Sequence, residues 1–419
     1  MLKRFFNKTK TVNINSKQQD KRRVLMFAPY SFPPTCAESI VTSKFIYTLL
    51  KTGWEIDVIA FQGAVEWYLK DDNNILSVVR QSVHFIGSKR IQEAIGLRFG
   101  LMQWIIRAVF LGIKLTRINK YDFILSRATP LCGHLPALLV QAKTKTPWIA
   151  NWSDPMPSSK APPPYGYGYN AKLGILQNMY LHLVSRYAHY HTFPCEGLRQ
   201  YYALYLPQIY RKSGVVPHIA LNNFQVDMPI NKQKFVICYA GSLTLRPLDV
   251  LFAALSKLKH TIGKNILFEF TVHNKLEVMD KARQYVVAAM VTVNNIKNYF
   301  QTLDIMRKAS VALIIEANLN DGIYLVSKVS DIVQIGKPIL ALSPRIGVLN
   351  DLITQHGGGM VVDNQSVDAV VYALETLFYA WQNNELQEKY GSGHLMSLFG
   401  EDVVLETFNY IVDCALENV

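Results

Sequence analysis

The chain has 419 residues and half of them are hydrophobic, which is enough for two or three domains with filled cores. The net charge is +13, but the first 222 residues carry 28 Lys and Arg against 11 Asp and Glu, and the rest carry 16 against 20. Such a basic half favours anionic lipid, a lipid diphosphate or nucleic acid as its partner. The scattered cysteines form no CxxC pair, which argues against a zinc or disulfide framework and suits a reducing cytoplasm.

Residues 1–23 form a polar, basic tail with eight Lys and Arg against the single Asp20. The tail lacks the apolar segment of a secretory signal. Two interpretations fit it. It is a disordered tail, or it is an electrostatic tether in which Leu2, Phe5 and Phe6 act as weak apolar anchors.

The first half reads as an alternation of strands and helices. Residues 24–28 predict a strand, 39–51 a helix and 56–60 a second strand, which is the opening of a Rossmann-like sheet. Further strands are expected at 121–126, 148–150 and 215–218, with a helix from residue 135. Because no GxGxxG follows the first strand, the sequence argues against a dinucleotide-dependent enzyme.

Residues 93–120 predict one long amphipathic helix. Its apolar face is expected to hold Leu97, Leu101, Trp104, Ala108, Leu111, Leu115 and Ile118, and another face Arg107, Lys114 and Arg117. Arg107 interrupts the apolar run, so a membrane-spanning helix is not expected. Either the helix packs on its own sheet with a solvated basic face, or that face docks on an anionic membrane surface.

The first half also contains a loop rich in Pro, Gly, Ser and Tyr at 151–170, which is long enough to suggest a functional loop or lid. A polar linker is expected at 222–234. After it, the sequence predicts strands at 235–240, 268–272, 311–315 and 339–342, a helix that contains Leu248, Leu251, Leu255 and Leu258, and a final helix at 402–416. This pattern is a second α/β unit.

The segment 327–342 is the most informative of the chain. Ser327 is a suitable N-cap, Gly336 a suitable helix stop, and Pro338 leads into a short apolar strand. A helix N-terminus at the end of a sheet strand binds anions. Lys328 in the first turn opposes the helix dipole unless an anion lies there as well, so the segment predicts an anion site.

The same segment resembles the donor-binding motif of GT-B glycosyltransferases of family four, in which a Ser-Lys pair precedes an acidic residue and a Gly-Lys-Pro strand entry. Four other short segments are similar to motifs of that family and follow its order: 27–34, 121–130, 147–155 and 239–242. The resemblance implies an α/β GT-B fold, two Rossmann-like domains that face each other across a cleft. It divides the chain into the tail 1–23, an acceptor domain 24–222, a nucleotide-sugar donor domain 223–400, and a helix 401–419 that crosses back to the first domain.

The chain departs from the family pattern at two places. Residues 35–38 read Thr-Cys-Ala-Glu where the family has a paired-glycine loop. Ile323 stands where the family has the first of two acids, and Asp331 matches the second. These departures leave open a different donor, weaker binding or lost activity.

The expected donor-binding residues are Gly241, Ser242, Arg246, His273, Ser327, Lys328 and Asp331. Arg246 and Lys328 would meet the diphosphate, His273 would lie near the base or sugar, and by resemblance Asp331 would bind the ribose. A surface role for the two cations, and a role in the helix dipole for Asp331, are the alternatives.

On the acceptor side, Asp154 is the candidate catalytic residue, which would orient or deprotonate the acceptor. An Asp that starts a turn before Pro is its alternative. Ser39 and His134 are the other acceptor-side candidates, and a buried structural His is the alternative for His134. No cofactor and no metal are expected, because the chain lacks a cluster with metal-ligand spacing and GT-B members usually need none.

The resemblance implies an enzyme that moves a sugar from a nucleotide-sugar to a glycan or lipid-linked acceptor, in the synthesis of a bacterial surface polysaccharide such as lipopolysaccharide or capsule, with retention. A cytoplasmic protein is expected, or one peripheral on the inner face of the cytoplasmic membrane. An anionic membrane surface is an expected partner and nucleic acid is not. The alternatives are a non-catalytic GT-B protein that binds a glycan or partner, and a nucleotide-sugar epimerase.

Overall fold

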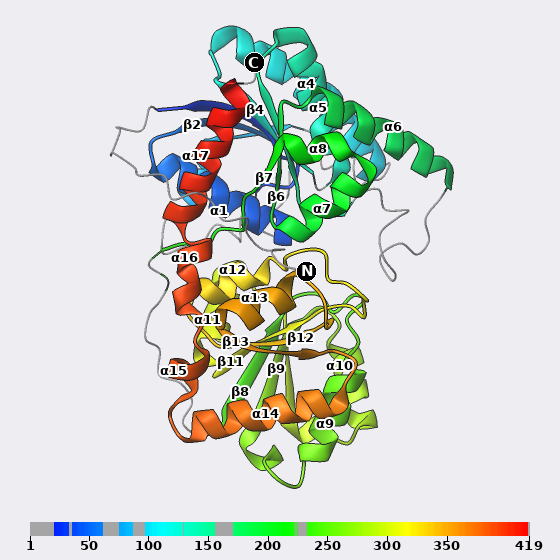
Figure 1. The fold of residues 1–419 in the computed structure, drawn as a ribbon, viewed down its shortest axis with the longest axis vertical. Helices are drawn as coiled ribbons and strands as arrows, with labels where there is room; N and C mark the ends of the chain where they lie inside the picture. Colours follow the sequence, from blue (N-terminus) through cyan, green and yellow to red (C-terminus); the bar gives the residue numbers. More distant parts are fainter. Residues whose placement is uncertain are drawn as a thin grey trace. The chain divides into compact units, whose positions relative to one another are not determined.

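The computed structural model describes residues 21–32, 36–61, 75–86, 97–128, 130–155, 171–222, 224 and 233–417. Most of the basic tail, most of the loop at 151–170 and most of the linker at 222–234 lie outside these residues. The chain divides into two compact units (Figure 1). Unit 1 holds the described residues within Met1–Ala161, Gly168–Ile219 and Glu401–Val419, and unit 2 those within Ala220–Gly400.

The described part of unit 1 contains a seven-stranded parallel sheet in the order β3-β2-β1-β4-β5-β6-β7. Its strands are β1 (Arg23–Phe27), β2 (Glu55–Phe61), β3 (Val83–Ile86), β4 (Phe123–Ala128), β5 (Trp148–Trp152), β6 (Tyr190–Phe193) and β7 (Ser213–Val215). The central strands contain continuous apolar runs of buried side chains, such as residues 24–27. A parallel sheet that is covered on both faces requires this pattern.

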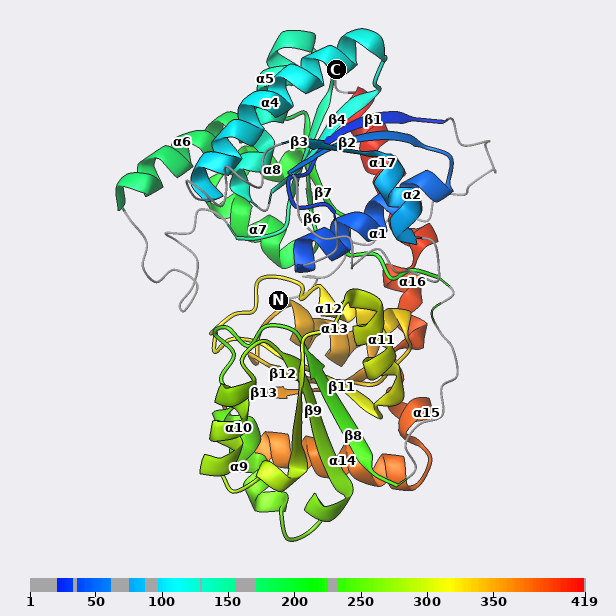
Figure 2. The same ribbon diagram turned by 180° about the vertical axis from the view of Figure 1, so that it is seen from behind.

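Two layers of helices cover the sheet of unit 1. The helices are α1 (Ala37–Lys51), α2 (Ile75–Gln81), α4 (Leu97–Ile118), α5 (His134–Thr144), α6 (Ala171–Tyr187), α7 (Glu196–Tyr205), α8 (Pro207–Arg211) and α17 (Glu401–Glu417). Helices α4, α5 and α6 lie on one side of the sheet, and α1 and α17 on the other (Figure 2). Gly112 allows α4 to lie close to the sheet, because a Cβ there would be 2.7 Å from the Phe27 ring.

Aromatic packing joins α17 to unit 1, although 185 residues of chain separate it from β7. The Phe408 ring lies 4.9 Å from that of Phe45, 5.9 Å from that of Trp54 and 6.3 Å from that of Phe123, measured between centroids. At the start of α17 the carboxylate of Glu401 accepts from Lys51 Nζ at 3.2 Å. The last helix of the chain is therefore part of the core of unit 1.

Unit 2 repeats the architecture with a six-stranded parallel sheet in its described residues, in the order β10-β9-β8-β11-β12-β13. Its strands are β8 (Phe235–Ala240), β9 (Ile266–Val272), β10 (Val291–Asn295), β11 (Val311–Ile315), β12 (Ile339–Ser343) and β13 (Gly359–Asp363). Its helices are α9 (Asp249–Leu258), α10 (Lys275–Gln284), α11 (Tyr299–Lys308), α12 (Lys328–Gln334), α13 (Val348–His356), α14 (Val367–Gln382), α15 (Leu386–Tyr390) and α16 (Met396–Phe399). A core of Leu, Ile, Val and Phe side chains fills the space between the sheet and α9, α10 and α14.

The structure confirms the strands predicted at 235–240 and 311–315 residue for residue, and the helix predicted at 402–416 lies within α17. The strand predicted at 215–218 is wrong in extent, because β7 ends at Val215. Ile118 was expected on the buried face of α4 but is 67% exposed. An α-helix has 3.6 residues per turn, so a seven-residue pattern drifts by about 20° per heptad and leaves the buried face after three heptads. None of the described helices combines the length and the apolar composition needed to cross a membrane.

The packing of Phe408 gives a test of the structure of unit 1. We expect Phe408→Ala to lower the free energy of unfolding of unit 1 by about 3–5 kcal/mol, because it removes a buried ring that contacts three others. The matched control is Tyr410→Ala on the same helix, whose side chain is 62% exposed and should cost less than about 0.5 kcal/mol. Urea unfolding followed by tryptophan fluorescence measures both variants, since five of the six tryptophans precede residue 220. Equal effects of the two changes would contradict the packing.

Candidate functional site

The strand order of unit 2 points to the place where a ligand would bind. The order reverses between β8 and β11, and in open parallel sheets ligands bind beyond the carboxyl ends of the strands at such a switch point. Gly241 and Ser242 follow β8, Glu316 follows β11, and Ser343 ends β12. These positions lie together at the carboxyl ends of neighbouring strands of one sheet and form the candidate site.

Gly241 and Lys328 form the closest contact of the site. Gly241 has φ +122°, which disfavours any other residue, and its N–H donates to Thr271 O at 3.0 Å. A Cβ at Gly241 would lie 2.9 Å from both Cε and Nζ of Lys328. The same Nζ lies 4.0 Å from the centroid of the Tyr239 ring, which is a cation–π distance. Lys328 therefore reaches from α12 to the end of β8 because residue 241 has no side chain.

A second cation approaches the same point. Burial and the charge of Arg246 lower the pKa of Lys328 to about 7, and the charge of Asp331 opposes this in part. The Arg246 side chain is half-buried, and its Nη1 donates to Thr244 O at 2.9 Å, within the loop that follows β8. Burial and the neighbouring cation thus disfavour the protonated form of Lys328. A ligand with negative charge would favour its protonated form.

Glu316 is a site residue that the sequence analysis did not single out. Its side chain is 3% exposed, and its Oε2 accepts from Ser343 Oγ at 2.5 Å. Its Oε1 has no hydrogen-bond partner among the described residues. Burial raises the pKa of Glu316 to about 7, although Ser343 and the charge of Arg246 act against the rise. The signal in the sequence was an acid placed directly after the five buried apolar residues of β11.

Asp331 lies on α12, one turn after Lys328, and a neighbouring side chain fixes its orientation. Tyr299 Oη donates to Asp331 Oδ1 at 2.8 Å. Gln334, on the same helix, donates to that Tyr299 oxygen at 3.4 Å and accepts from the Leu221 N–H at 2.9 Å. The hydrogen bond from Tyr299, which Gln334 contacts in turn, therefore holds the Asp331 carboxylate in its orientation.

The expected cap of α12 is wrong. Ser327 precedes the helix, but its φ of −57° and ψ of −28° are already helical, and its side chain makes no cap hydrogen bond. A capping side chain needs an extended backbone at that position. The helix is only seven residues long, so the anion site that the sequence predicts would depend on side-chain cations more than on the helix N-terminus. The predicted stop is confirmed, because Gly336 follows the helix with φ +68°.

Two further donor-side candidates occupy the same edge of the sheet. The Oγ of the exposed Ser242 is hydrogen-bonded to Thr244 Oγ1 at 2.8 Å. The backbone carbonyl of Ser242 accepts from Tyr239 Oη at 2.5 Å. These bonds hold the loop after β8 in place. His273 follows β9, the strand next to β8, and is exposed. The structure thus places Lys328 against Gly241 and within range of the charges of Arg246 and Asp331. The charge of Arg246 also reaches Glu316, and the exposed His273 lies at the rim.

The acceptor-side candidates belong to unit 1. Asp154 is exposed after β5, and its backbone carbonyl accepts from Tyr202 Oη at 2.9 Å. Ser39 is buried at the start of α1, where its Oγ accepts from the Cys36 N–H at 2.9 Å. His134 is fully buried, with Nδ1 2.7 Å from Ser126 Oγ, and burial lowers its pKa to about 3. Ser39 and His134 thus lie in the interior, and their acceptor role stays a prediction.

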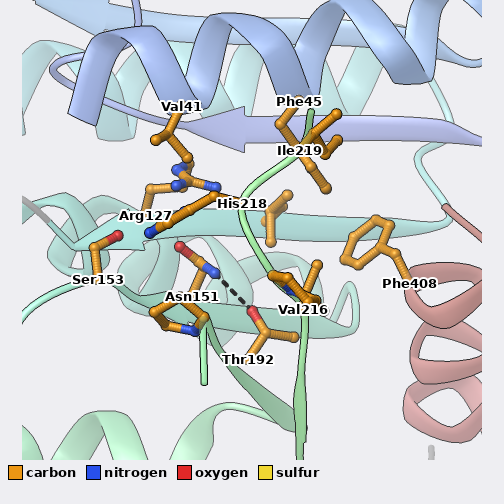
Figure 3. Close-up of a pocket in the computed structure, with 13 residues that line it drawn as sticks. Val41, Phe45, Arg127, Asn151, Ser153, Thr192, Val216, His218, Ile219 and Phe408 are labelled. Carbon is orange, nitrogen blue, oxygen red and sulfur yellow. Dashed lines mark hydrogen bonds between the residues drawn. The ribbon is translucent and has the colours of Figure 1, made fainter. Parts of the chain in front are cut away.

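A small cavity lies at the carboxyl ends of β4, β5 and β6 in unit 1 (Figure 3). Arg127, Asn151, Thr192 and His218 line it, and Asn151 Nδ2 donates to Thr192 Oγ1 at 2.9 Å. Its volume of about 20 Å³ is room for one water molecule. The cavity suits a buried water and is too small for a sugar.

Comparisons with known proteins find similarity in structure alone. No family model matches the chain, and no curated protein matches it. HepE of Anabaena in complex with UDP matches with a TM-score of 0.65 at 10% identity, over 94% of this chain and 99% of HepE. A glycosyltransferase from Rickettsia africae matches with a TM-score of 0.65 at 12% identity, over 96% and 100%. An enzyme assigned as a UDP-N-acetylglucosamine 2-epimerase from Listeria monocytogenes matches with a TM-score of 0.59 at 12% identity, over 95% and 98%.

At such identities the likeness shows the fold. Two parallel sheets of seven and six strands, each covered by helices, agree with these neighbours in topology and extent. The chain therefore has the α/β fold with two Rossmann-like domains that GT-B glycosyltransferases share.

Proposed function

We propose that the protein transfers a sugar from a nucleotide-sugar to an acceptor hydroxyl. The observation that carries the proposal is the placement of Lys328 against Gly241, within range of the charge of Arg246, at the switch point of the sheet in unit 2. Transfer from a nucleotide-sugar leaves a nucleoside diphosphate, whose charge must be stabilised as the glycosidic bond breaks. The structure of HepE with UDP, which shares the fold, supports the same ligand class here.

In this proposal Lys328 and Arg246 neutralise the diphosphate. The ammonium of Lys328 is held in a desolvated place, where charge interactions are stronger than in water. Because its pKa is near 7, Lys328 would take up a proton as the diphosphate binds. Gly241 contributes by leaving the backbone at the end of β8 open to the ligand.

Asp331 and Glu316 would bind hydroxyl groups of the donor. Asp331 would accept from the ribose, which the resemblance implies and its support by Tyr299 favours. Glu316 has one buried oxygen without a partner in the described residues, and we propose that this oxygen binds a sugar hydroxyl. His273 and Ser242 at the rim would contact the base or sugar.

The acceptor is proposed to be a glycan or a lipid-linked sugar of a bacterial surface polysaccharide. The basic charge of the first 222 residues supports an acceptor that carries phosphate, and the exposed Asp154 after β5 is its proposed base. Retention of configuration and independence from metal are part of the proposal and are supported by the resemblance alone. A nucleotide-sugar epimerase is the second candidate, because the Listeria protein shares the fold.

The donor class can be identified by thermal-shift titration with UDP, GDP, ADP, CMP and dTDP. We expect one nucleotide to raise the midpoint with concentration, since a ligand that binds only the native state stabilises it. Lys328→Met and Asp331→Ala should each lower the affinity for that nucleotide by at least about tenfold, because each removes one charged contact. Lys308→Met is the matched control, because Lys308 is an exposed lysine on α11 of the same unit.

Three outcomes would count against this assignment. If no nucleotide binds, the donor site is absent. If the two variants bind as tightly as the wild type, the site lies elsewhere. If proton NMR shows that UDP-N-acetylglucosamine is converted to its 2-epimer without an acceptor, the protein is an epimerase. Release of the nucleoside diphosphate that needs an added acceptor supports the transferase.

The affinity for the nucleoside diphosphate should fall as pH rises above 7. Above its pKa Lys328 is neutral, and Glu316 becomes a buried anion near the same site, so both changes disfavour an anionic ligand. We expect a loss of about tenfold between pH 7 and pH 8.5 by isothermal titration calorimetry. Lys328→Arg, which stays charged, should flatten the profile. A steep profile in that variant would assign the dependence to another group.

Glu316 also makes a prediction about stability. Its folded pKa of about 7 lies above the ordinary value of 4.5, so in the unfolded chain the carboxyl ionises first. The stability of the folded state is therefore fully present below pH 4.5 and falls as pH rises from 4.5 to 7. Glu316→Gln stays neutral and should stabilise unit 2 by about 2 kcal/mol at pH 8 and by less than about 0.5 kcal/mol at pH 4.5. Hydrogen exchange of the β11 and β12 amides measures the difference. A stabilisation that does not change with pH would contradict the burial of the carboxylate as the cause of its raised pKa.

A further inference from the structure

One face of unit 1 exposes large apolar side chains. They are Met102, Ile106 and Phe110 on α4, Leu139 on α5, and Ile175, Leu176, Met179 and Leu183 on α6, each 45–71% exposed. On α4 they recur every four residues, as do three of those on α6, so each set forms a stripe along its helix. The three helices lie side by side on the same side of the sheet (Figure 2). We call this surface the α4–α6 face.

The same helices carry no Asp or Glu. Their exposed basic residues are Arg107, Lys114, Arg117, Lys143 and Arg186. Between residues 94 and 195 the chain has only two acids, Asp122 and Asp154, and neither lies on these helices. The α4–α6 face is thus apolar and basic without acidic residues.

The opposite layer of unit 1 has the reverse charge. Helix α17 carries five acidic residues and no Lys or Arg. Because α17 and α4 lie on opposite sides of one sheet, unit 1 has a positive and a negative side. A negatively charged surface would attract the first and repel the second, and would orient the unit.

We propose that the α4–α6 face adsorbs to an anionic lipid membrane, with the apolar stripes in the headgroup boundary and the basic residues at the phosphates. Charge complementarity carries the choice of partner, because an interface with lipid needs apolar side chains to enter and cations to meet the phosphates, and acids oppose it. A groove of about 970 Å³ between α6 and α8 extends the face, with Met179 and Leu183 in its lining and Arg186 and Arg211 beside them. That arrangement also suits an acyl chain below a phosphate.

The test is co-sedimentation of the full chain with vesicles. Wild-type protein should bind vesicles of phosphatidylglycerol and phosphatidylethanolamine, bind phosphatidylcholine vesicles at least tenfold more weakly, and dissociate as salt is raised. Reversal of Arg107, Lys114 and Arg117 to Glu should reduce partition at least a hundredfold, since each basic residue contributes a factor of about five. Replacement of Ile175, Leu176 and Met179 by Ser should reduce it at least tenfold.

Matched controls separate the face from general charge and hydrophobicity. Reversal of the exposed lysines Lys264, Lys297 and Lys308 of unit 2 changes the net charge by the same amount, and Tyr410→Ser removes an exposed apolar side chain from α17. Both controls should bind as the wild type does. Circular dichroism of each variant checks that it is folded.

Several results would overturn the proposal. Binding that persists in the face variants would assign it to the basic tail at 1–23 or to another surface. Equal binding to phosphatidylcholine would remove the role of charge. If the protein does not bind vesicles but forms a concentration-dependent dimer, and replacement of Ile175, Leu176 and Met179 by Ser abolishes that dimer, the face is an interface between two copies. Vesicle binding needs no sugar transfer, so it can fail or succeed independently of the proposed function.

Discussion

The contact between Lys328 and the end of β8 is the constraint on which the donor-side site depends. Its ammonium lies against the Tyr239 ring and the backbone of Gly241, in a space that a side chain at residue 241 would fill. Lys328 gains a cation–π contact there but loses hydration, and its pKa falls to about 7. Arg246 adds to the cost of the charge. An anionic ligand would reverse both effects.

Burial also disfavours the charged form of Glu316, but in a carboxyl group this raises the pKa instead of lowering it. Burial raises its pKa to about 7, so both titratable groups at this edge of the sheet are least stable in their charged forms. A core built for stability alone would have apolar residues at these positions, as the strands before them do. The two charged forms are therefore unfavourable in the candidate site, and a ligand with phosphates and hydroxyls could stabilise them. Functional sites commonly reduce the stability of their domain in this way.

The sequence predicted much of this because its signals were local. Continuous apolar runs fixed the central strands, Gly336 ended α12, and the Ser-Lys-x-x-Asp spacing placed Lys328 and Asp331 one turn apart. What it missed depends on contacts between distant segments. Glu316 becomes a site residue only because β12 brings Ser343 beside it, and Tyr299 reaches Asp331 from another helix. The edge strands β3, β10 and β13 were also missed, since they are short and their residues are less uniformly buried. The four-residue strand β6, which lies next to the edge strand β7, was missed as well.

Charge in unit 1 follows the layers of the fold and not the order of the sequence. The helices α4, α5 and α6 come before β6, and α17 is added from the end of the chain, yet the first three lack acids and the last lacks bases. A basic composition that served only solubility would spread both signs over both layers. Because the two signs of charge are separated across one sheet, a charged surface would orient the unit. The exposed apolar stripes lie on the positively charged helices. A surface that is both negative and able to accept apolar side chains matches that combination, and anionic lipid has both properties.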